Sequence, residues 1–425
     1  MLEKYRARLD KSEFYKSIFT LMTGTALSQI IPLAITPILT RLYTPDDFGL
    51  LALYLSTVSI LTLVATGNYE KAIIMPKQDR DAVGIIKLAF LLSVSASLTI
   101  LLLTIFLREQ IARFYNNPKI IDLLFFVPFS VFSLAIYNII NTWFNRVKQY
   151  SVLSYNRVTK SSLSSVFSIA FGISKLATIG LIFSEFLGQL FATILFGRSF
   201  YRTNRGDFIA TSKADMIRLA KDYKKFPQFS LPADLLSMGS YQLPIFLFSK
   251  FFTQAVVGYY SLCIRVLDKP FIFFTNAVYE VFRQKAMEDY NRDGNCRSIY
   301  IKTFKRLLVI SLPIMSIFII ASPLIFKVVF GNEWEVAGHY ARIISVMYIF
   351  KFVASPLSFM FYVANKQRLD FLLHVYVFLS SCLILTLSFK SAFTIEKTLI
   401  LFVLNYSLVY IFYIFKSYQF ANGKA

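Results

Sequence analysis

The sequence has few of the side chains that bind metal ions or form disulfide frameworks. It holds three cysteines and two histidines in 425 residues. Cys263, Cys296 and Cys382 are too few and too scattered for a framework, and a zinc site would have almost no ligands. We therefore expect no metal site, no cofactor and no metal-dependent catalysis.

Acidic residues are also scarce, with 24 Asp and Glu against 45 Lys and Arg, which gives a formal net charge of +21. In a soluble chain this excess would indicate nucleic-acid binding. However, only 16% of the residues are charged and 56% are hydrophobic, with 45 Phe and 25 Tyr. Too little polar surface remains to cover a water-exposed globule. We expect most of the chain to lie in lipid and expect no nucleic-acid partner.

Long hydrophobic runs are abundant, and a run of about 20 apolar residues is enough for a helix to cross a bilayer core of about 30 Å. Twelve candidates can be read from the sequence: 17–39, 48–66, 83–107, 120–144, 154–173, 179–197, 226–248, 256–282, 307–330, 336–363, 371–389 and 398–415. The fifth is the weakest, because Asn156, Arg157 and Lys160 interrupt its start. A re-entrant or interfacial segment is the alternative there.

The basic residues support twelve spans. With an even number of spans and a cytoplasmic start, 31 of the 45 Lys and Arg lie on the inner side and 9 on the outer side. This bias follows the positive-inside rule and predicts that both termini are cytoplasmic. The segment 1–16 is either a short amphipathic helix or a solvated basic tail.

One internal match relates the two halves of the chain at an offset of 209 residues. Residues 40–53 align with 249–262, each on the outer loop between the first two spans of its half. The aligned pairs are Arg41 with Lys250, Tyr43 with Phe252, Thr44 with Thr253, and Gly49 with Gly258. Six spans in each half give both halves the same orientation. We therefore predict an all-α integral membrane protein with about 12 transmembrane helices in two six-helix lobes around a central cavity.

The predicted organisation has five parts. These are a cytoplasmic N-terminal segment (1–16), an N-lobe (17–197), a basic cytoplasmic linker (198–225), a C-lobe (226–416) and a cytoplasmic tail (417–425).

Ionisable side chains within the spans need a partner or a wet cavity, because each costs about 2.5–3.5 kcal/mol at mid-bilayer. The eighth span contains Arg265, Asp268 and Lys269, and the tenth contains Arg342 and Lys351. These four bases, counted against the acids Asp234, Asp268 and Glu185, predict a cationic interior that binds an anionic substrate. Snorkelling or a packing ion pair is the alternative. Gln29 is a further candidate for the cavity wall, although helix–helix hydrogen bonding would explain it equally well.

Three acids are candidates for coupling transport to H⁺ or Na⁺. Asp234 lies on a polar, proline-bounded helix, Glu185 lies in the sixth span, and Asp268 lies beside the cations of the eighth.

Several enzyme classes lack their motifs in this sequence. No Gly-rich phosphate loop, zinc-binding helix or nucleophile elbow occurs with the required flanks. A membrane-embedded polysaccharide polymerase would need a large outer loop, whereas the longest here is about 108–119. We expect a carrier and not an enzyme.

Residues 41–53 and 65–76, with an echo at 249–262, resemble the bacterial oligosaccharide flippases of the polysaccharide transporter family. That family belongs to the multidrug/oligosaccharidyl-lipid/polysaccharide superfamily. The resemblance implies two lobes around a cationic cavity that opens alternately to each side of the bacterial cytoplasmic (inner) membrane. The implied substrate is an undecaprenyl-diphosphate-linked repeat unit, such as that of O-antigen in lipopolysaccharide biosynthesis. Arg265, Lys269 and Lys351 fit a diphosphate-binding role by depth.

The resemblance also bears on partners. It implies contacts with membrane lipids, with H⁺ or Na⁺ as a coupling ion, and with a polysaccharide polymerase and a chain-length regulator. Two alternatives stay open: a cation-coupled multidrug exporter of the same superfamily, which would present an acidic cavity, and an integral-membrane polymerase.

Overall fold

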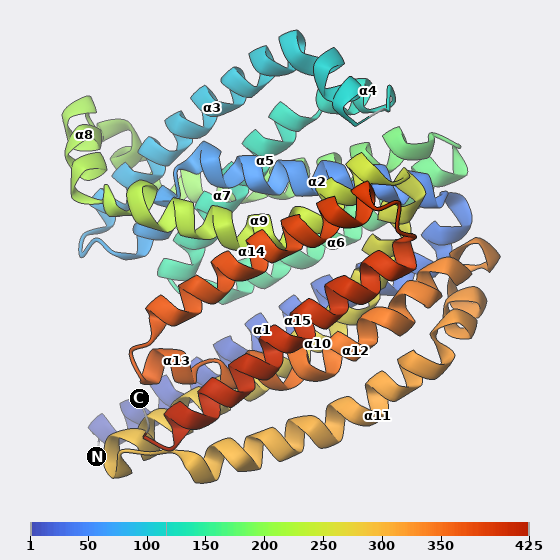
Figure 1. Ribbon diagram of the computed structural model, residues 1–425. Helices are drawn as coiled ribbons and strands as arrows, with labels where there is room; N and C mark the ends of the chain where they lie inside the picture. The colour runs from blue at the N-terminus through green and yellow to red at the C-terminus, as the bar shows by residue number, and fades with distance from the viewer. Residues whose placement is uncertain (1, 116, 424–425) are drawn as a thin grey trace. The chain divides into compact units, whose positions relative to one another are not determined.

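The computed structural model describes residues 2–115 and 117–423, and in these ranges the chain forms helices and connections but no strands (Figure 1). The first half contains α1 (Leu2–Leu42), α2 (Pro45–Thr66), α3 (Asp79–Phe114), α4 (Ile120–Leu124), α5 (Val127–Arg146), α6 (Tyr150–Ile173), α7 (Ala177–Ala210) and α8 (Lys213–Asp222). The second contains α9 (Leu231–Phe251), α10 (Gln254–Asp293), α11 (Arg297–Phe330), α12 (Glu335–Leu357), α13 (Met360–Val363), α14 (Gln367–Lys390) and α15 (Ile395–Ala421). The choice between an amphipathic helix and a basic tail for 1–16 depends on side chains outside those described.

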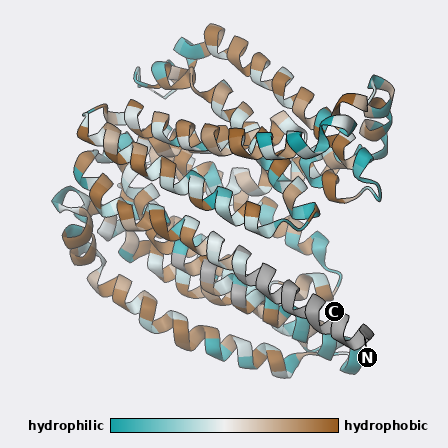
Figure 2. Cartoon of the chain, turned by 180° about the vertical axis from the view of Figure 1, so that it is seen from behind, coloured by the Kyte–Doolittle hydropathy of each residue, from teal (hydrophilic) through white to brown (hydrophobic). Residues whose placement is uncertain are grey.

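The helices have the length and composition of membrane spans. Among the described residues, nine are long and apolar enough to cross a bilayer. Figure 2 shows hydrophobic residues along the middle of many helices and hydrophilic residues gathered near helix ends and connections. Only helices and closed barrels satisfy their backbone groups within lipid, which explains why the spans are helical. The prediction of an all-α integral membrane protein is confirmed.

Three predicted spans are not among those nine, and all three are helical. They correspond to α6, α9 and α10, which have 24, 21 and 40 residues. Polar and charged side chains lower their mean hydropathy, but α6 alone is about 36 Å long at 1.5 Å per residue. The fifth candidate is therefore one uninterrupted helix, long enough to cross the bilayer core.

The structure also differs from the predicted segments in detail. The fourth run is divided into α4 and α5, and the tenth is divided into α12 and α13. The predicted linker, 198–225, is mostly helical, because α7 continues to Ala210 and α8 follows. Ser212 and Asp215 form a capping box that starts α8.

The chain divides into two compact units. The first comprises Met1–Tyr43 with Leu53–Leu235, and the second comprises Thr44–Ala52 with Leu236–Ala425. In the first unit α3 packs on α5, and α7 packs on α5 and α6. In the second unit α11 packs on α12, and α15 packs on α12 and α14. The contacts of α3, α5, α6 and α7 in the first unit thus correspond to those of α11, α12, α14 and α15 in the second.

The repeated segments begin their helices at equivalent positions. α2 starts at Pro45 and α10 starts at Gln254, which are separated by the predicted offset of 209. The threonine before each helix supplies the N-cap: Thr44 accepts a hydrogen bond from the backbone of Asp47, and Thr253 accepts one from Val256. The short sequence match therefore corresponds to a repeated structural feature.

Small side chains allow the helices of the first unit to approach closely. On α6, Ser154 donates a hydrogen bond to the carbonyl of Thr20, and Ser161 donates one to the carbonyl of Ser28. Arg157 donates to the hydroxyl of Thr25 at 2.7 Å. Arg157, which interrupts the start of the fifth predicted span, and the serines of α6 thus contribute to the packing of α6 against α1.

Candidate functional site

A buried carboxylate on α10 is the centre of a polar cluster in the second unit. Asp268 is 5% exposed. Its Oδ1 accepts hydrogen bonds from the hydroxyl of Tyr348 at 2.6 Å and from Nζ of Lys351 at 2.7 Å, and its Oδ2 accepts one from the hydroxyl of Tyr241 at 2.8 Å. The donors come from α9 and α12, so the cluster joins three helices.

Aromatic rings surround the ammonium of Lys351. Its Nζ lies 4.4 Å from the centroid of the Tyr348 ring and 5.1 Å from that of Phe271. Faces of aromatic rings attract cations, and more strongly where water is excluded. The Lys351 side chain is 20% exposed. A carboxylate and two rings thus hold this ammonium.

The ion pair changes the expected charge of the interior. Lys351 is one of the cations predicted to bind an anionic substrate, and the structure pairs it with Asp268, which lies 83 residues earlier in the chain. Removing one partner of a buried pair typically costs about 3–5 kcal/mol, because the other charge stays buried. Most of the attraction that Lys351 would offer to an anion is balanced inside the protein.

The other predicted cations of the second unit lie nearer its surface. Arg265 is half-buried on α10, and its guanidinium carbon lies 5.7 Å from the centroid of the buried Phe48 ring. Lys269 is one turn further along and exposed. Arg342 on α12 is exposed and donates a hydrogen bond to the carbonyl of Ile320 at 3.2 Å. Arg265 and Lys269 thus form a pair of cations, one helical turn apart, on the helix that also carries Asp268.

Glu185 and Lys160 line a small cavity of about 60 Å³ within the first unit. Gln189, one turn after Glu185 on α7, also lines it and has a buried Oε1 without a hydrogen-bond partner in the structure. The hydroxyl of Tyr54 lies 2.5 Å from Oγ of Ser130 on the same wall. A cavity of this size that contains several polar groups has room for a few water molecules.

Asp234, the third predicted coupling acid, lies at the start of α9 and is grouped with the first unit. Its Oδ2 accepts hydrogen bonds from the side-chain amide of Asn68 and from Nζ of Lys71 at 2.5 Å. Asn68 and Gly67 both have left-handed backbone angles, with φ of 62° and 59°. These two residues turn the chain from α2 into the short 3₁₀ helix Tyr69–Ile74, which carries Lys71 to Asp234.

The same 3₁₀ helix buries a second carboxyl group. Glu70 is 8% exposed, and its Oε2 has no hydrogen-bond partner in the structure. Burial raises the pKa of this carboxyl, and a hydrogen bond from Thr66 and the charge of Lys71 oppose the shift. Arg146 closes the other end of the segment by donating hydrogen bonds to the carbonyls of Ile73 and Ile74.

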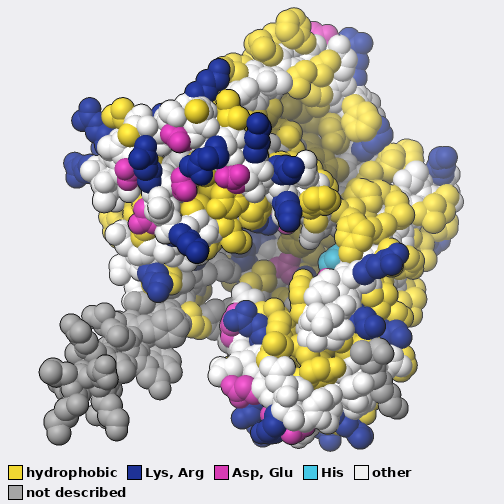
Figure 3. Space-filling model, turned by 90° about the vertical axis from the view of Figure 1, so that its left-hand side faces the viewer, with side chains coloured by type: hydrophobic (Ala, Val, Ile, Leu, Met, Phe, Trp, Pro, Cys, Tyr) yellow, Lys and Arg dark blue, Asp and Glu magenta, His cyan; other side chains and the backbone are white. Residues whose placement is uncertain are grey.

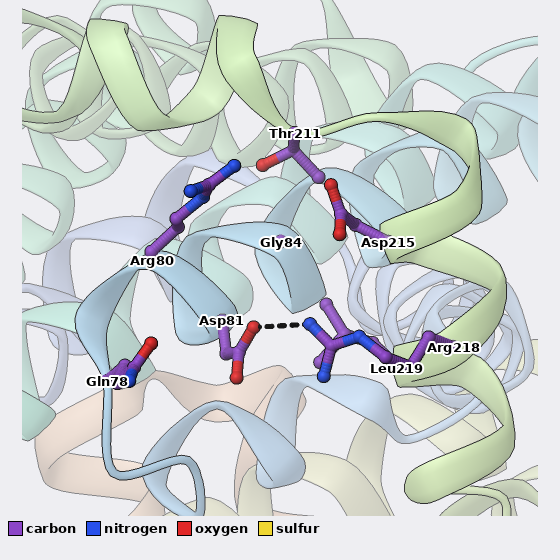
Figure 4. A pocket seen from close by; sticks show the side chains of 8 residues that line it. All are labelled: Gln78, Arg80, Asp81, Gly84, Thr211, Asp215, Arg218 and Leu219. Carbon is purple, nitrogen blue, oxygen red and sulfur yellow. Dashed lines mark hydrogen bonds and ion pairs between the residues drawn. The ribbon is translucent and has the colours of Figure 1, made fainter.

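A larger pocket of about 330 Å³ lies between the start of α3 and α8 (Figure 4). Arg218 on α8 donates a hydrogen bond to Asp81 on α3 at 2.6 Å, and Arg80 and Asp215 line the opposite side. Figure 3 shows basic and acidic side chains mixed over the part of the first unit that carries α8. The charges of both signs compensate each other here, as in a solvated surface.

A family model for polysaccharide biosynthesis proteins matches residues 38–338. The chain belongs to this family. The matched range begins in α1 and ends within α12, so it includes the 3₁₀ segment around Glu70 and the Asp268 position. The family predicted from residues 41–53 and 65–76 is thereby confirmed. No protein of curated function matches the sequence.

Solved transporters share the fold of this polysaccharide biosynthesis protein. The lipid II flippase MurJ in an inward closed conformation is 15% identical, with a TM-score of 0.70, and 94% of this chain and 89% of that one are covered. An inward-facing MATE transporter of the MOP superfamily is 14% identical, with a TM-score of 0.63 over 94% and 93% of the chains. A MOP superfamily transporter from Pyrococcus furiosus, described as having a binding pocket of reverse polarity, is 13% identical, with a TM-score of 0.61 and the same coverage. At such identities the likeness establishes the fold.

Some residues of the polar clusters described above were not among the candidates predicted from the sequence. Tyr241 and Tyr348 bind Asp268, Asn68 and Lys71 bind Asp234, and Lys160 shares a cavity with Glu185. The motif 65–76 contained Asn68 and Lys71, and Tyr348 precedes Lys351 by one helical turn. Gln29, by contrast, is half-buried on α1 in the first unit, whereas the predicted cations belong to the second.

Proposed function

We propose that this protein is a flippase that moves lipid-linked oligosaccharide repeat units across the bacterial cytoplasmic membrane. Membership of a polysaccharide biosynthesis family and the fold shared with a lipid II flippase support this proposal. The substrate would be an undecaprenyl-diphosphate-linked unit, such as that of O-antigen, and transport would proceed by alternating access from the cytoplasmic to the periplasmic leaflet. In this proposal both termini lie in the cytoplasm, which the charge bias of the sequence supports.

The pair of cations on α10, Arg265 and Lys269, is the proposed contact for the substrate's diphosphate. Arg265 and Lys269 are one helical turn apart, so their charged groups can bind neighbouring phosphates. A diphosphate loses its hydration on entering a transport pathway, and guanidinium and ammonium groups replace it. Arg342 and Gln29 are secondary candidates for contacts with the substrate. Lys351 contributes to this contact indirectly, because it pairs with Asp268 and so balances the negative charge on the helix that carries Arg265 and Lys269.

Energy coupling in this proposal is assigned to the first unit. Glu185 lines a small cavity together with Lys160 and Gln189, and Asp234 is held by Asn68 and Lys71, so these two acids are the proposed sites of H⁺ or Na⁺ exchange. A polysaccharide polymerase and a chain-length regulator are the expected partners of such a flippase, along with the surrounding lipids.

The experiment that tests the proposal reconstitutes the purified protein into liposomes with a fluorescent undecaprenyl-diphosphate oligosaccharide. Flipping is measured as the loss of fluorescence accessible to a quencher in the outer medium. We expect Arg265→Ala and Lys269→Ala each to slow flipping at least tenfold. The matched control is Lys327→Ala, which removes an exposed lysine paired with Glu335 on α11 and α12 and should flip normally. Wild-type protein that leaves the fluorescent lipid in its original leaflet would refute the proposal.

A multidrug exporter is the second candidate, because MATE transporters share the fold. Such a protein would carry organic cations instead of an anionic lipid. The same liposomes, loaded with a fluorescent organic cation, distinguish the two. Ion-driven export of this dye without any flipping of the lipid would favour the exporter.

A further inference from the structure

The Asp268 cluster has the chemistry of a cation-binding site that already holds a cation. Oδ1 of Asp268, the hydroxyl oxygen of Tyr348 and the ring faces of Tyr348 and Phe271 converge on one position, and Nζ of Lys351 occupies it. Tyr241 donates a hydrogen bond to the other carboxylate oxygen. The carboxylate and the Phe271 ring come from α10, whereas Tyr348 and the ammonium itself come from α12. The bound cation is thus tethered by four methylene groups.

We propose that Tyr241, Asp268, Phe271 and Tyr348 form a site for a primary ammonium ion, and that Lys351 is its permanent, tethered occupant. In consequence Asp268 is not the residue that binds an external H⁺ or Na⁺, because a covalently attached cation competes for the same oxygen. The counter-ion of Asp268 is thus the side chain of Lys351 in the same unit. This inference concerns the folded protein alone and does not depend on the proposed substrate.

The donors around the carboxylate favour an ammonium over Na⁺. The Tyr241 hydroxyl donates to Oδ2 of Asp268, and the Tyr348 hydroxyl donates to Oδ1, which it shares with Nζ of Lys351. The phenols thus neutralise part of the carboxylate charge, and a single carboxylate oxygen contacts the cation. The Tyr348 oxygen lies 3.4 Å from Nζ, at the outer limit of a hydrogen bond. Two ring faces complete the surroundings, and rings are the usual cage of ammonium groups. Na⁺ would find too few oxygens here, because hard cations need several oxygen ligands.

The test removes the tether and returns the cation in solution. Lys351→Ala deletes a fragment with the structure of n-propylammonium and leaves the space that it filled. The thermal unfolding midpoint of the purified full-length protein is measured in detergent with 0–100 mM n-propylammonium chloride, and with NaCl at equal ionic strength. We expect a saturable rise of several degrees for Lys351→Ala with propylammonium and a much smaller rise with NaCl. The wild type should respond equally to the two salts.

The matched control is Asp268→Asn combined with Lys351→Ala, which has the same space but no charge to hold the ion. It should show no saturable response to propylammonium. The proposal is overturned if Lys351→Ala responds equally to both salts, or if the double variant responds as strongly as the single one.

A second comparison decides the matter if Lys351→Ala gives no folded protein. Lys351→Met keeps most of the side-chain volume and leaves Asp268 buried without a cation. Asp268→Asn should then raise the unfolding midpoint in the Lys351→Met background and lower it in the wild type. A change of the same sign in both backgrounds would show that the two charges do not depend on each other, contrary to the proposal.

Discussion

Gly49 and Gly258 occupy equivalent positions in the internal repeat and lie against each other within the second unit. A Cβ placed on Gly49 would collide with the carbonyl of Gln254 and lie 3.1 Å from the backbone nitrogen of Gly258. A Cβ placed on Gly258 would collide with the carbonyl of Pro45 and lie 3.2 Å from the nitrogen of Gly49. Pro45 and Gln254 are themselves related by the 209-residue offset. The contact is reciprocal, as at a local two-fold axis, and glycine is required on both sides.

Either glycine should therefore be intolerant of a methyl group. We expect Gly49→Ala and Gly258→Ala each to destabilise the protein by about 1–3 kcal/mol, because backbone atoms must move apart to admit the Cβ. The double variant should cost less than the two single costs together, since one displacement relieves both collisions. Unfolding midpoints of the purified proteins in detergent measure these effects.

Gly206→Ala on α7 is the control for this pair. A Cβ at Gly206 meets no atom within 4 Å, so the substitution should be neutral or should stabilise the helix by up to about 1 kcal/mol. If all three alanine variants unfold at the wild-type midpoint, the close approach of α2 and α10 is not a feature of the folded protein.

A second prediction compares two glycines of one helix. A Cβ on Gly188 would collide with Oγ of Ser164 and lie 2.8 Å from the Ser164 nitrogen, whereas at Gly197 the nearest atom is 4.0 Å away. Both residues lie on α7, so their helix propensities cancel in the comparison. Gly188→Ala should lower the unfolding midpoint and Gly197→Ala should not. Equal midpoints would contradict the close packing of α6 on α7.

The span pattern could be predicted from the sequence because it depends on local composition. A bilayer demands about 20 apolar residues in succession, and the runs that became α2, α3, α11 and α15 satisfy this without help from neighbours. Breaks such as that between α4 and α5 were missed, since Phe125 and Phe126 are as apolar as the helices beside them. The role of the serines of α6 could not be predicted, because they form their hydrogen bonds only when α1 lies against them.

The partners of the charged residues could not be predicted in the same way. Spacing placed Asp268 beside Arg265 and Lys269 on one helix, yet its ion pair is with Lys351 on another. Choosing among several cations requires knowing which helices are neighbours and how each is rotated, and neither follows from hydropathy. The same applies to Asp234, whose partner Lys71 is 163 residues away.

A third prediction concerns Arg146, whose side chain is 12% exposed. It donates hydrogen bonds to the carbonyls of Ile73 and Ile74 at 3.1 and 3.2 Å, and to Asp79 at 2.9 and 3.0 Å. Lysine cannot reproduce this planar fork, so Arg146→Lys should destabilise the protein by about 1–3 kcal/mol. Asp79→Asn should cost less than about 1 kcal/mol, because Asp79 is 65% exposed.

Exposed Arg113 on α3 supplies the matched control, since its side chain is 81% exposed. Arg113→Lys should leave the unfolding midpoint unchanged. Equal effects of the two Arg→Lys substitutions would mean that the carbonyl contacts of Arg146 do not stabilise the segment between α2 and α3.

The last prediction concerns pH and the buried carboxyl of Glu70. Burial raises its pKa above the ordinary 4.5, so the folded protein binds the proton more tightly than the unfolded chain does. The stability that the neutral form provides is complete below pH 4.5 and is lost as pH rises through the raised pKa of the folded state. Glu70→Gln has no proton to lose, so its stability relative to the wild type should increase between pH 5 and pH 8. Unfolding midpoints of both proteins at the two pH values give this difference directly. A relative stability that stays constant or falls would mean that the Glu70 carboxyl is as well solvated in the folded protein as in the unfolded chain.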